Sequence, residues 1–364
     1  MIRIEPRESP SRRFTIGIPV ASALLALLLA AIPLSFAGAN IGEAYQQMAK
    51  GIFGSMFAFT EMLTRATPLI FTGLAATLAF RAKLWNIGAE GQLYLGAMAA
   101  VAVGTGWISG PPILLIPMIL IAGALAGALG MAGPAYLKTR FGADEVVTTL
   151  LLNFIILIFI QMMLEGPLKD PMGMGWPQSS PVVDNAILPQ ILPRMRLHYG
   201  LVIALVAAVI AHIMLSKSVW GLKLRAVGEN AAAALHAGIG VKRTLMSAAL
   251  ISGALAGLAG VSEVAGLRGY LTNDLSPGYG YTGIVVAMLA GLSPLGVVIA
   301  ALFIASVFVG SDTMSRAMGV SSYLADLVVS MSLICVLVGG FIARFTIKIT
   351  PSNKKSSTTD TGAA

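Results

Sequence analysis

The sequence predicts an all-α integral membrane protein with about ten transmembrane or re-entrant helices, and three observations support this fold class. Of its 364 residues, 57% are hydrophobic and 11% are charged, whereas a soluble domain carries roughly 25% charged residues. Charge-free stretches recur along the chain, and most are long enough to cross a hydrocarbon core about 30 Å thick as a helix. The alternating hydrophobicity of lipid-facing strands is missing, so we do not expect an outer-membrane barrel.

Ten hydrophobic segments account for these stretches. Residues 14–42 and 66–80 carry no charge, and residues 84–137 carry only Glu90 and are long enough for two crossings. We expect the first helix to remain uncleaved, because its apolar run exceeds the roughly 7–15 residues of a signal peptide. The segments are expected at 14–36, 62–80, 88–108, 112–133, 146–164, 199–216, 245–265, 281–291, 296–310 and 322–343.

The stretch 275–311 decides the count of segments. It is free of charge and too long for one crossing, and it is interrupted by Pro277, Gly278 and the sequence GLSPLG at 291–296. These helix-breaking proline and glycine residues predict two helices. The first, 281–291, is too short to span alone, so whether it spans is left open; the alternative is a re-entrant helix, buried in protein where a broken backbone is tolerated.

The basic residues orient the chain. With ten segments both termini share a side, and placing them in the cytoplasm follows the positive-inside rule. Only seven of the 24 Lys and Arg residues then lie outside: Lys50, Arg65, Lys169, Arg194, Arg196, Arg268 and Arg316. The net charge of +8 therefore indicates membrane topology and contact with anionic lipid, and not a nucleic-acid partner.

Two loops are long enough to have a role of their own. The exterior loop 165–198 is rich in proline and has room for short helices that cap a vestibule or meet a partner; a plain exterior loop is equally favoured. In the inside loop 217–244, the sequence ENAAAALHAGI predicts a cytoplasmic helix over about 230–237, with Asn230 as its N-cap and Gly238 as its stop. That helix either docks into another protein or belongs to an ordinary linker.

Four polar residues within or at the edge of the predicted membrane segments are candidates to line a translocation path. Asn86, Glu90 and Gln92 lie where the third segment begins, and Asn153 lies near the middle of the fifth. A carboxylate at a helix centre costs about 2.5–3.5 kcal/mol, so Glu90 should face protein or water. For Glu90 a cap on nearby backbone is slightly favoured over solute contact. For Asn153 a helix–helix hydrogen bond is the alternative.

Two further patterns concern packing. Glu61 and Arg65 are four residues apart, which favours an ion pair at the outer interface. Small residues at a spacing of three or four allow helices to approach closely. They occur at Gly123, Gly127, Gly130, Gly253, Gly257 and Gly260.

The motifs of soluble catalysts are missing from the sequence. It contains no GxxxxGK[ST] phosphate loop, no HExxH and no GxSxG, and it has one cysteine and three histidines. We therefore expect no catalytic residues, no cofactor and no metal site in this chain. An ion-coupled secondary transporter remains an alternative, although the few carboxylates inside the membrane segments offer little for ion coupling.

Four stretches, in consistent order, resemble the permease subunits of ABC importers of the branched-chain amino acid, ribose and nucleoside group. They are RATPLIFTGLAATLAFRAKLWNIGAEGQLYLGA (65–97), GADEVVTTLLLNFI (142–155), LRAVGENAAAALHAGIGVKR (224–243) and GYGYTGIVVAMLAGLSPLG (278–296). The NIGAEGQ sequence and the long N-terminal extension most resemble the larger permease subunit of nucleoside or simple-sugar importers.

This resemblance implies a permease fold like those of the ribose and vitamin B12 importers. It implies three protein partners: a cytoplasmic ATPase with two nucleotide-binding halves that bind ATP and Mg, a second homologous permease subunit, and an exterior substrate-binding lipoprotein. The 224–243 stretch matches the coupling region of the group. The coupling residues carried over are Gly228, Glu229, Asn230 and Gly238, with Asn230 standing where the widespread EAA wording has its first alanine.

The resulting organisation is a cytoplasmic tail at 1–13, a permease domain at 14–345 and a disordered cytoplasmic tail at 346–364, in a bacterial cytoplasmic (inner) membrane. Nucleosides are the expected solute because the branch resemblance points to them. Simple sugars and branched-chain amino acids are the alternatives.

Overall fold

The computed structural model describes residues 2–6, 12–36, 38–106 and 108–349. Parts of the predicted tails 1–13 and 346–364 lie outside the described residues.

The described chain is predominantly helical, which confirms the predicted fold class. Its helices are α1 (Arg12–Phe36), α2 (Ile41–Phe53), α3 (Met56–Arg81), α4 (Ala89–Gly104), α5 (Pro112–Phe141), α6 (Glu145–Glu165), α7 (Gly200–Lys217), α8 (Val219–Glu229), α9 (Ala231–His236), α10 (Val241–Glu263), α11 (Tyr279–Leu289), α12 (Pro294–Met318) and α13 (Ser322–Arg344). A 3-10 helix η1 (Asp184–Ala186), a π-helix η2 (Val264–Arg268) and the strands β1 (Ile2–Pro6) and β2 (Phe345–Ile349) complete the elements. Each of the ten predicted segments overlaps one helix.

Seven helices of the described chain are long and apolar enough to cross a membrane: α3, α5, α6, α7, α10 extended by η2, α12 and α13. Two of the predicted segments are shorter than a full crossing. Helix α4 has 16 residues and ends at Gly104, earlier than expected, because the chain turns at Gly106 with φ +94°. Helix α11 has 11 residues, and it breaks at Gly291 before α12, as the sequence predicts.

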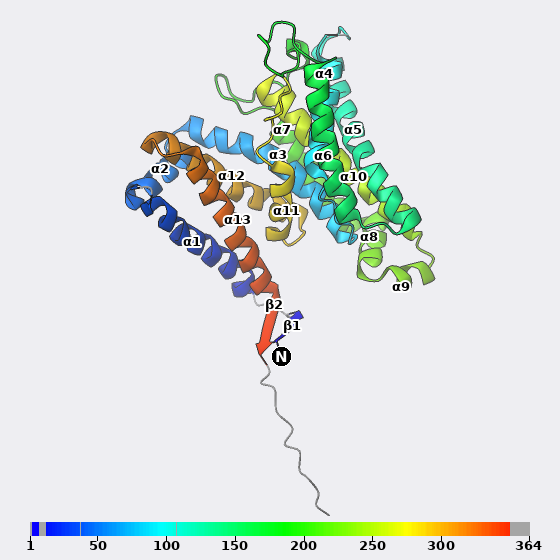
Figure 1. Ribbon diagram of the computed structural model, residues 1–364. Coiled ribbons are helices and arrows are strands. Elements are labelled where there is room, and N and C mark those ends of the chain that lie inside the picture. The colour runs from blue at the N-terminus through cyan, green and yellow to red at the C-terminus, as the bar shows by residue number, and fades with distance from the viewer. Residues whose placement is uncertain (1, 7–11, 37, 107, 350–364) are drawn as a thin grey trace, which may run out of the picture.

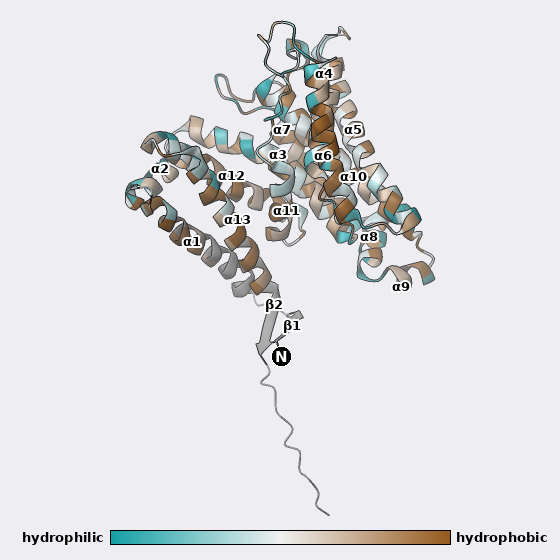
Figure 2. Ribbon diagram, in the orientation of Figure 1, coloured by the Kyte–Doolittle hydropathy of each residue, from teal (hydrophilic) through white to brown (hydrophobic). Residues whose placement is uncertain are grey.

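Helix α3 forms the centre of the molecule. It contacts α7, α10, α11 and α12, and 89% of its most apolar stretch is buried, against 22% for α6. Large apolar side chains of the outer helices, such as Leu129, Ile158 and Ile210, are exposed. In Figure 2 most of the α6 ribbon has the brown colour of hydrophobic residues. These helices therefore present the surface that a lipid environment requires.

Glycines bring α4, α5 and α10 into backbone contact, as predicted. A Cβ atom added at Gly127 would overlap the carbonyl oxygen of Gly253, and one added at Gly257 would overlap that of Gly123. Only glycine permits this approach, so these positions hold the three helices together.

The first and last helices lie side by side. Helix α1 packs along α13, and β1 pairs antiparallel with β2 from Ile2↔Ile349 to Pro6↔Phe345. Strand β2 therefore occupies residues 346–349 of the segment expected to be disordered. Helix α2 was not predicted; it packs on α12, where Gly51 contacts Thr313. In Figure 1 the two strands and α9 lie toward the lower end, and loop 165–198 lies at the opposite end.

Candidate functional site

The segment between α3 and α4 is held by the predicted polar residues. Asn86 Oδ1 accepts from the N–H of Gly88 at 2.9 Å, and Asn86 Nδ2 donates to Gln92 Oε1 at 2.8 Å and to Ser252 Oγ at 2.9 Å. Gln92 Nε2 donates back to Asn86 Oδ1 at 3.0 Å. Both side chains are fully buried. Their hydrogen bonds fix the turn that starts α4 and tie it to α10.

Asn153 joins the same cluster from α6. Its Oδ1 accepts from the N–H of Gly91 at 2.9 Å, and its Nδ2 donates to the carbonyl of Ile87 at 2.9 Å and to the hydroxyl of Tyr281 at 3.2 Å. The structure thus contains the helix–helix hydrogen bonds that were the alternative for Asn153. Contact of Asn153 with a solute stays a prediction.

Glu90 lies where two helices begin. Its Oε2 accepts from the N–H of Gly280 at 2.6 Å, one residue into α11, while Glu90 itself lies in the first turn of α4. A Cβ atom at Gly280 would overlap the backbone of Glu90, so the two helix starts touch. The N-terminal ends of α4 and α11 therefore meet at this buried carboxyl group. Glu90 caps backbone, as the slightly favoured reading expected.

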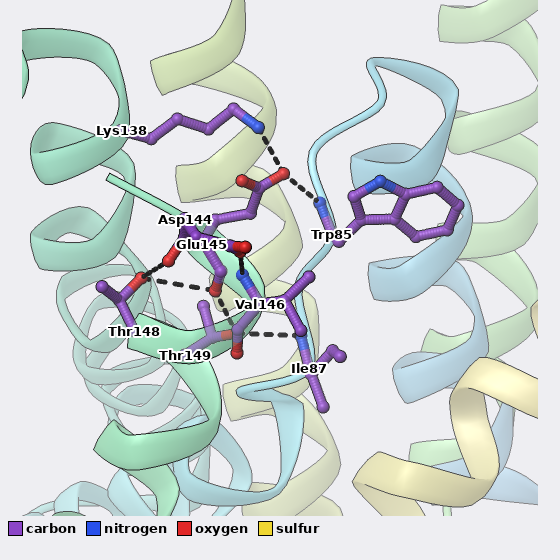
Figure 3. Close-up of polar contacts among 8 residues, drawn as sticks. All are labelled: Trp85, Ile87, Lys138, Asp144, Glu145, Val146, Thr148 and Thr149. Atoms are coloured by element: carbon purple, nitrogen blue, oxygen red, sulfur yellow. Dashed lines mark hydrogen bonds and ion pairs between the residues drawn. The ribbon is translucent and has the colours of Figure 1, made fainter. Parts of the chain in front are cut away.

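A second anchor was not predicted: the N-terminus of α6 binds the same α3–α4 segment (Figure 3). The Glu145 carboxylate accepts from the N–H of Trp85 at 3.2 Å and pairs with Lys138 of α5. Thr149 accepts from the N–H of Ile87 at 3.2 Å. The sequence carried only the signal that Asp144 precedes an apolar run; Asp144 caps α6 through the N–H of Val146 at 2.8 Å.

The helix predicted over about 230–237 is present as α9. Asn230 Oδ1 accepts from the N–H of Ala233 at 3.0 Å, and Gly238 follows the helix at φ +79°. The predicted N-cap, Asn230, and the predicted C-terminal stop, Gly238, are therefore confirmed. One side of α9 borders a mostly apolar groove of about 670 Å³, in which Leu235 is 64% exposed.

Helix α8 links α9 to the central helix. A Cβ atom at Gly228 would overlap the carbonyl oxygen of Arg81, the last residue of α3. Lys83 Nζ donates to the carbonyl of Glu229 at 3.5 Å. Displacement of α8 and α9 therefore acts on the end of α3 and on the segment that carries Asn86.

A charged cavity of about 600 Å³ lies away from α9, on the side of loop 165–198. The residues that define it here are Glu61, Arg65, Arg196, Glu263, Arg268 and Tyr279. The predicted pair of Glu61 with Arg65 was wrong. The guanidinium of Arg65 instead lies 2.9 Å from Asp312 of α12, and Arg196 lies 3.6 Å from Glu61, because α12 and loop 165–198 bring other partners closer.

Loop 165–198 covers the region beside this cavity. The N–H of Val182 donates to the carbonyl of Gly269 at 2.7 Å, and that of Leu188 donates to the carbonyl of Ala265 at 2.8 Å. His198, at the end of the loop, is buried and accepts through Nδ1 from the N–H of Gly200 at 3.1 Å. The loop contains one short helix, η1, and it lies over the ends of α4 and α10.

Within the described ranges, no group of three or more His, Cys, Asp or Glu residues could hold a metal ion. Among the described residues, the arrangement supplies buried hydrogen-bonding groups at the start of α4 and charged groups around the cavity.

Comparison with known proteins gives one family. The model for the permease component of branched-chain amino acid transport systems matches residues 58–337. A guanosine ABC transporter permease of Bacillus subtilis is 37% identical over 321 residues, covering 88% of this chain and 92% of its own. A glucose ABC transporter permease of Haloferax volcanii is 33% identical and covers 96% and 94%, and a nucleoside ABC transporter permease of Lactococcus lactis is 32% identical and covers 82% and 84%. No solved structure matches.

Proposed function

The chain belongs to the family of branched-chain amino acid transport permeases, so it is a multi-pass membrane subunit of an ABC transporter, and we propose that it imports nucleosides. The observation that carries the nucleoside proposal is its 37% identity, over most of both chains, to a guanosine permease. The similar glucose permease supports a simple sugar as the second candidate.

The chain works with an ATPase and with a substrate-binding protein, as ABC permeases do. We propose that the ATPase has two nucleotide-binding halves that bind ATP and Mg, that a second homologous permease completes the membrane part, and that the binding protein is an exterior lipoprotein. Both termini would lie in the cytoplasm of a bacterial inner membrane. The seven candidate spans and the basic residues at the α9 side support this placement.

The proposed mechanism uses Gly228, Glu229, Asn230 and Gly238 as the coupling region. When ATP closes the nucleotide-binding halves, they would move α9, and α8 would transmit the displacement through the packed contact of Gly228 with Arg81. Helix α3 and the segment at its end would then shift against α11. The permease pair would thereby change the side of the membrane to which the cavity between its subunits opens.

The predicted path residues lie where this displacement arrives. Asn86, Glu90, Gln92 and Asn153 are buried and bound to groups of the protein in this conformation. Their proposed contact with the solute requires a second conformation in which α4, α6 and α11 have separated.

Uptake of radiolabelled guanosine by cells that express the complete transporter tests the proposed function. Gly238→Trp should abolish uptake while the amount of permease in the membrane stays the same, because the bulky side chain would stand in the groove beside α9. Gly175→Trp is the matched control: this glycine also has a positive φ and open surroundings, but it lies in loop 165–198. Normal uptake by Gly238→Trp would refute the coupling assignment, and uptake that survives deletion of the ATPase would favour a secondary transporter.

A further inference from the structure

The charges around the charged cavity are paired within the protein. Arg268 lies 3.8 Å from Asp274, so each of the three arginines has a carboxylate partner. Glu263 is the additional carboxylate. It is 2% exposed and interacts electrostatically with Arg65 and Arg268. The walls therefore carry no uncompensated positive charge, and an anionic solute is disfavoured.

The backbone of one wall is irregular. Helix α10 ends in the π-helix η2, and such single π turns occur frequently at functional sites. Gly269 follows at φ +79°, a conformation that glycine adopts at no steric cost. The π turn and this glycine direct the chain from Glu263 around the cavity to the loop that precedes α11.

One residue of the cavity lining is hydrogen-bonded to the starts of α4 and α11. Ser276 lines the cavity, and its Oγ accepts from the N–H groups of Gly278 at 3.1 Å and Tyr279 at 2.9 Å. The N–H of Ser276 donates to the hydroxyl of Tyr94 on α4 at 3.2 Å. Four residues further on, Gly280 is bound by Glu90. The cavity thus lies next to the start of α11, which the coupling movement would displace.

We propose that the charged cavity is the solute-binding site of this permease on the side of loop 165–198, and that it takes an uncharged nucleoside. The proposal rests on the proposed nucleoside transport and adds where the solute binds and which groups select it. The cavity volume of about 600 Å³ falls within the roughly 300–1,000 Å³ of small-molecule sites.

The chemistry of the lining fits the edges and faces of a base. Guanidinium groups donate to the O6 and N7 acceptors of a purine, and carboxylates accept from exocyclic amino groups. Arg65, Arg268 and Glu263 supply these groups around one space. Tyr270 and Tyr279 add aromatic rings to the lining, and such rings stack on bases. The site selects a nucleoside over its phosphorylated form, because each arginine is already paired with a carboxylate of the protein.

Cysteine protection tests this site in the complete transporter. The chain has one cysteine, Cys335, so Cys335→Ala gives a background without thiols in this chain. Leu267→Cys places a thiol in the cavity lining, and Met172→Cys places one on the exposed loop tip. An impermeant methanethiosulfonate reagent should modify both in intact cells, but only modification at position 267 should reduce guanosine uptake, by about tenfold.

The same variants report the class of the solute. External guanosine should slow modification of Leu267→Cys during uptake and leave Met172→Cys unaffected. Protection by glucose or leucine but not by guanosine would overturn the nucleoside assignment. Modification at position 267 that leaves uptake intact would overturn the site.

Glu263→Gln provides a second readout that does not depend on a thiol. Replacing the carboxyl group by an amide should lower guanosine uptake about tenfold while the amount of permease in the membrane is retained. Glu165→Gln, an exposed carboxylate at the end of α6, is the matched control and should transport normally. Equal uptake by both variants would count against the proposal.

The transporter that carries Cys335→Ala and no other substitution separates the two proposals. If it takes up no nucleoside, the proposed function fails. If it takes up guanosine but the cavity variants behave like their controls, only the assignment of the cavity fails.

Discussion

His198 shows how one buried side chain at the end of loop 165–198 makes the stability of the fold depend on pH. Its ring fills the space left by Gly200 and Gly266, and its Nε2 is buried without a hydrogen-bond partner. Burial lowers the pKa of His198 from 6.5 to about 4. Because Nδ1 accepts a hydrogen bond from a backbone N–H, the neutral ring carries its proton on Nε2.

The lowered pKa of His198 determines the direction in which stability changes with pH. The unfolded chain binds a proton near pH 6.5 and the folded chain only near pH 4, so stability that is present above pH 6.5 is lost as the pH falls toward 4. The full loss is roughly 3 kcal/mol, since each pKa unit corresponds to about 1.4 kcal/mol. His198→Asn, which keeps an acceptor for Gly200, should remove this part of the pH dependence. Thermal unfolding of both proteins in detergent from pH 7 to pH 4 measures it, and identical slopes would contradict the assignment.

At the scale of elements, the junction of α4, α6 and α11 carries the most consequential hydrogen bonds. Asn153→Ala would leave the N–H of Gly91 and the carbonyl of Ile87 without their partner. Each unsatisfied buried group costs about 1–3 kcal/mol, so we expect a clear fall in the unfolding temperature. Gln161→Ala on the same helix removes only an exposed contact with Glu165 and should change stability by less than about 0.5 kcal/mol.

This pair of variants also decides between the two roles of Asn153. If Asn153 serves to hydrogen-bond the helices to one another, stability and uptake of Asn153→Ala should fall together. A pure solute contact predicts that uptake falls while the unfolding temperature stays with that of the control.

The elements that the sequence predicted are those governed by local rules. Charge-free length located the ten membrane segments, and the caps Asn230 and Gly238 located α9 within a residue at each end. Helix α2 was missed because its amphipathic stretch is too polar to register as a span. The contacts of Glu145 with the N–H of Trp85 and of Arg65 with Asp312 were missed because these partners lie 60 and 247 residues away in the chain, and single-sequence spacing contains no information about such contacts.

The charged cavity did leave a trace in the sequence. Arg65, Arg196 and Arg268 are three of the seven basic residues that the topology placed outside, against the positive-inside rule. Basic residues that oppose this bias therefore marked the cavity, although their convergence required the fold.

At the scale of the whole molecule, two opposite ends are joined by one helix. Helix α8, which continues into α9, packs on the end of α3, and α3 extends to Glu61 and Arg65 at the charged cavity. Figure 1 shows α9 and loop 165–198 at opposite ends of the helical body. The proposed coupling region can face an ATPase, and the charged cavity can face a protein that delivers the solute, only if the membrane lies between these two ends of the molecule.

The side of the membrane on which each end lies is therefore the most direct test of the account. In the Cys335→Ala background, Lys223→Cys on α8 and Met172→Cys in loop 165–198 both place a thiol at an exposed position. An impermeant maleimide added to intact cells should label Met172→Cys and should label Lys223→Cys only after the membrane is permeabilised. Labelling of Lys223→Cys from outside intact cells would contradict the account.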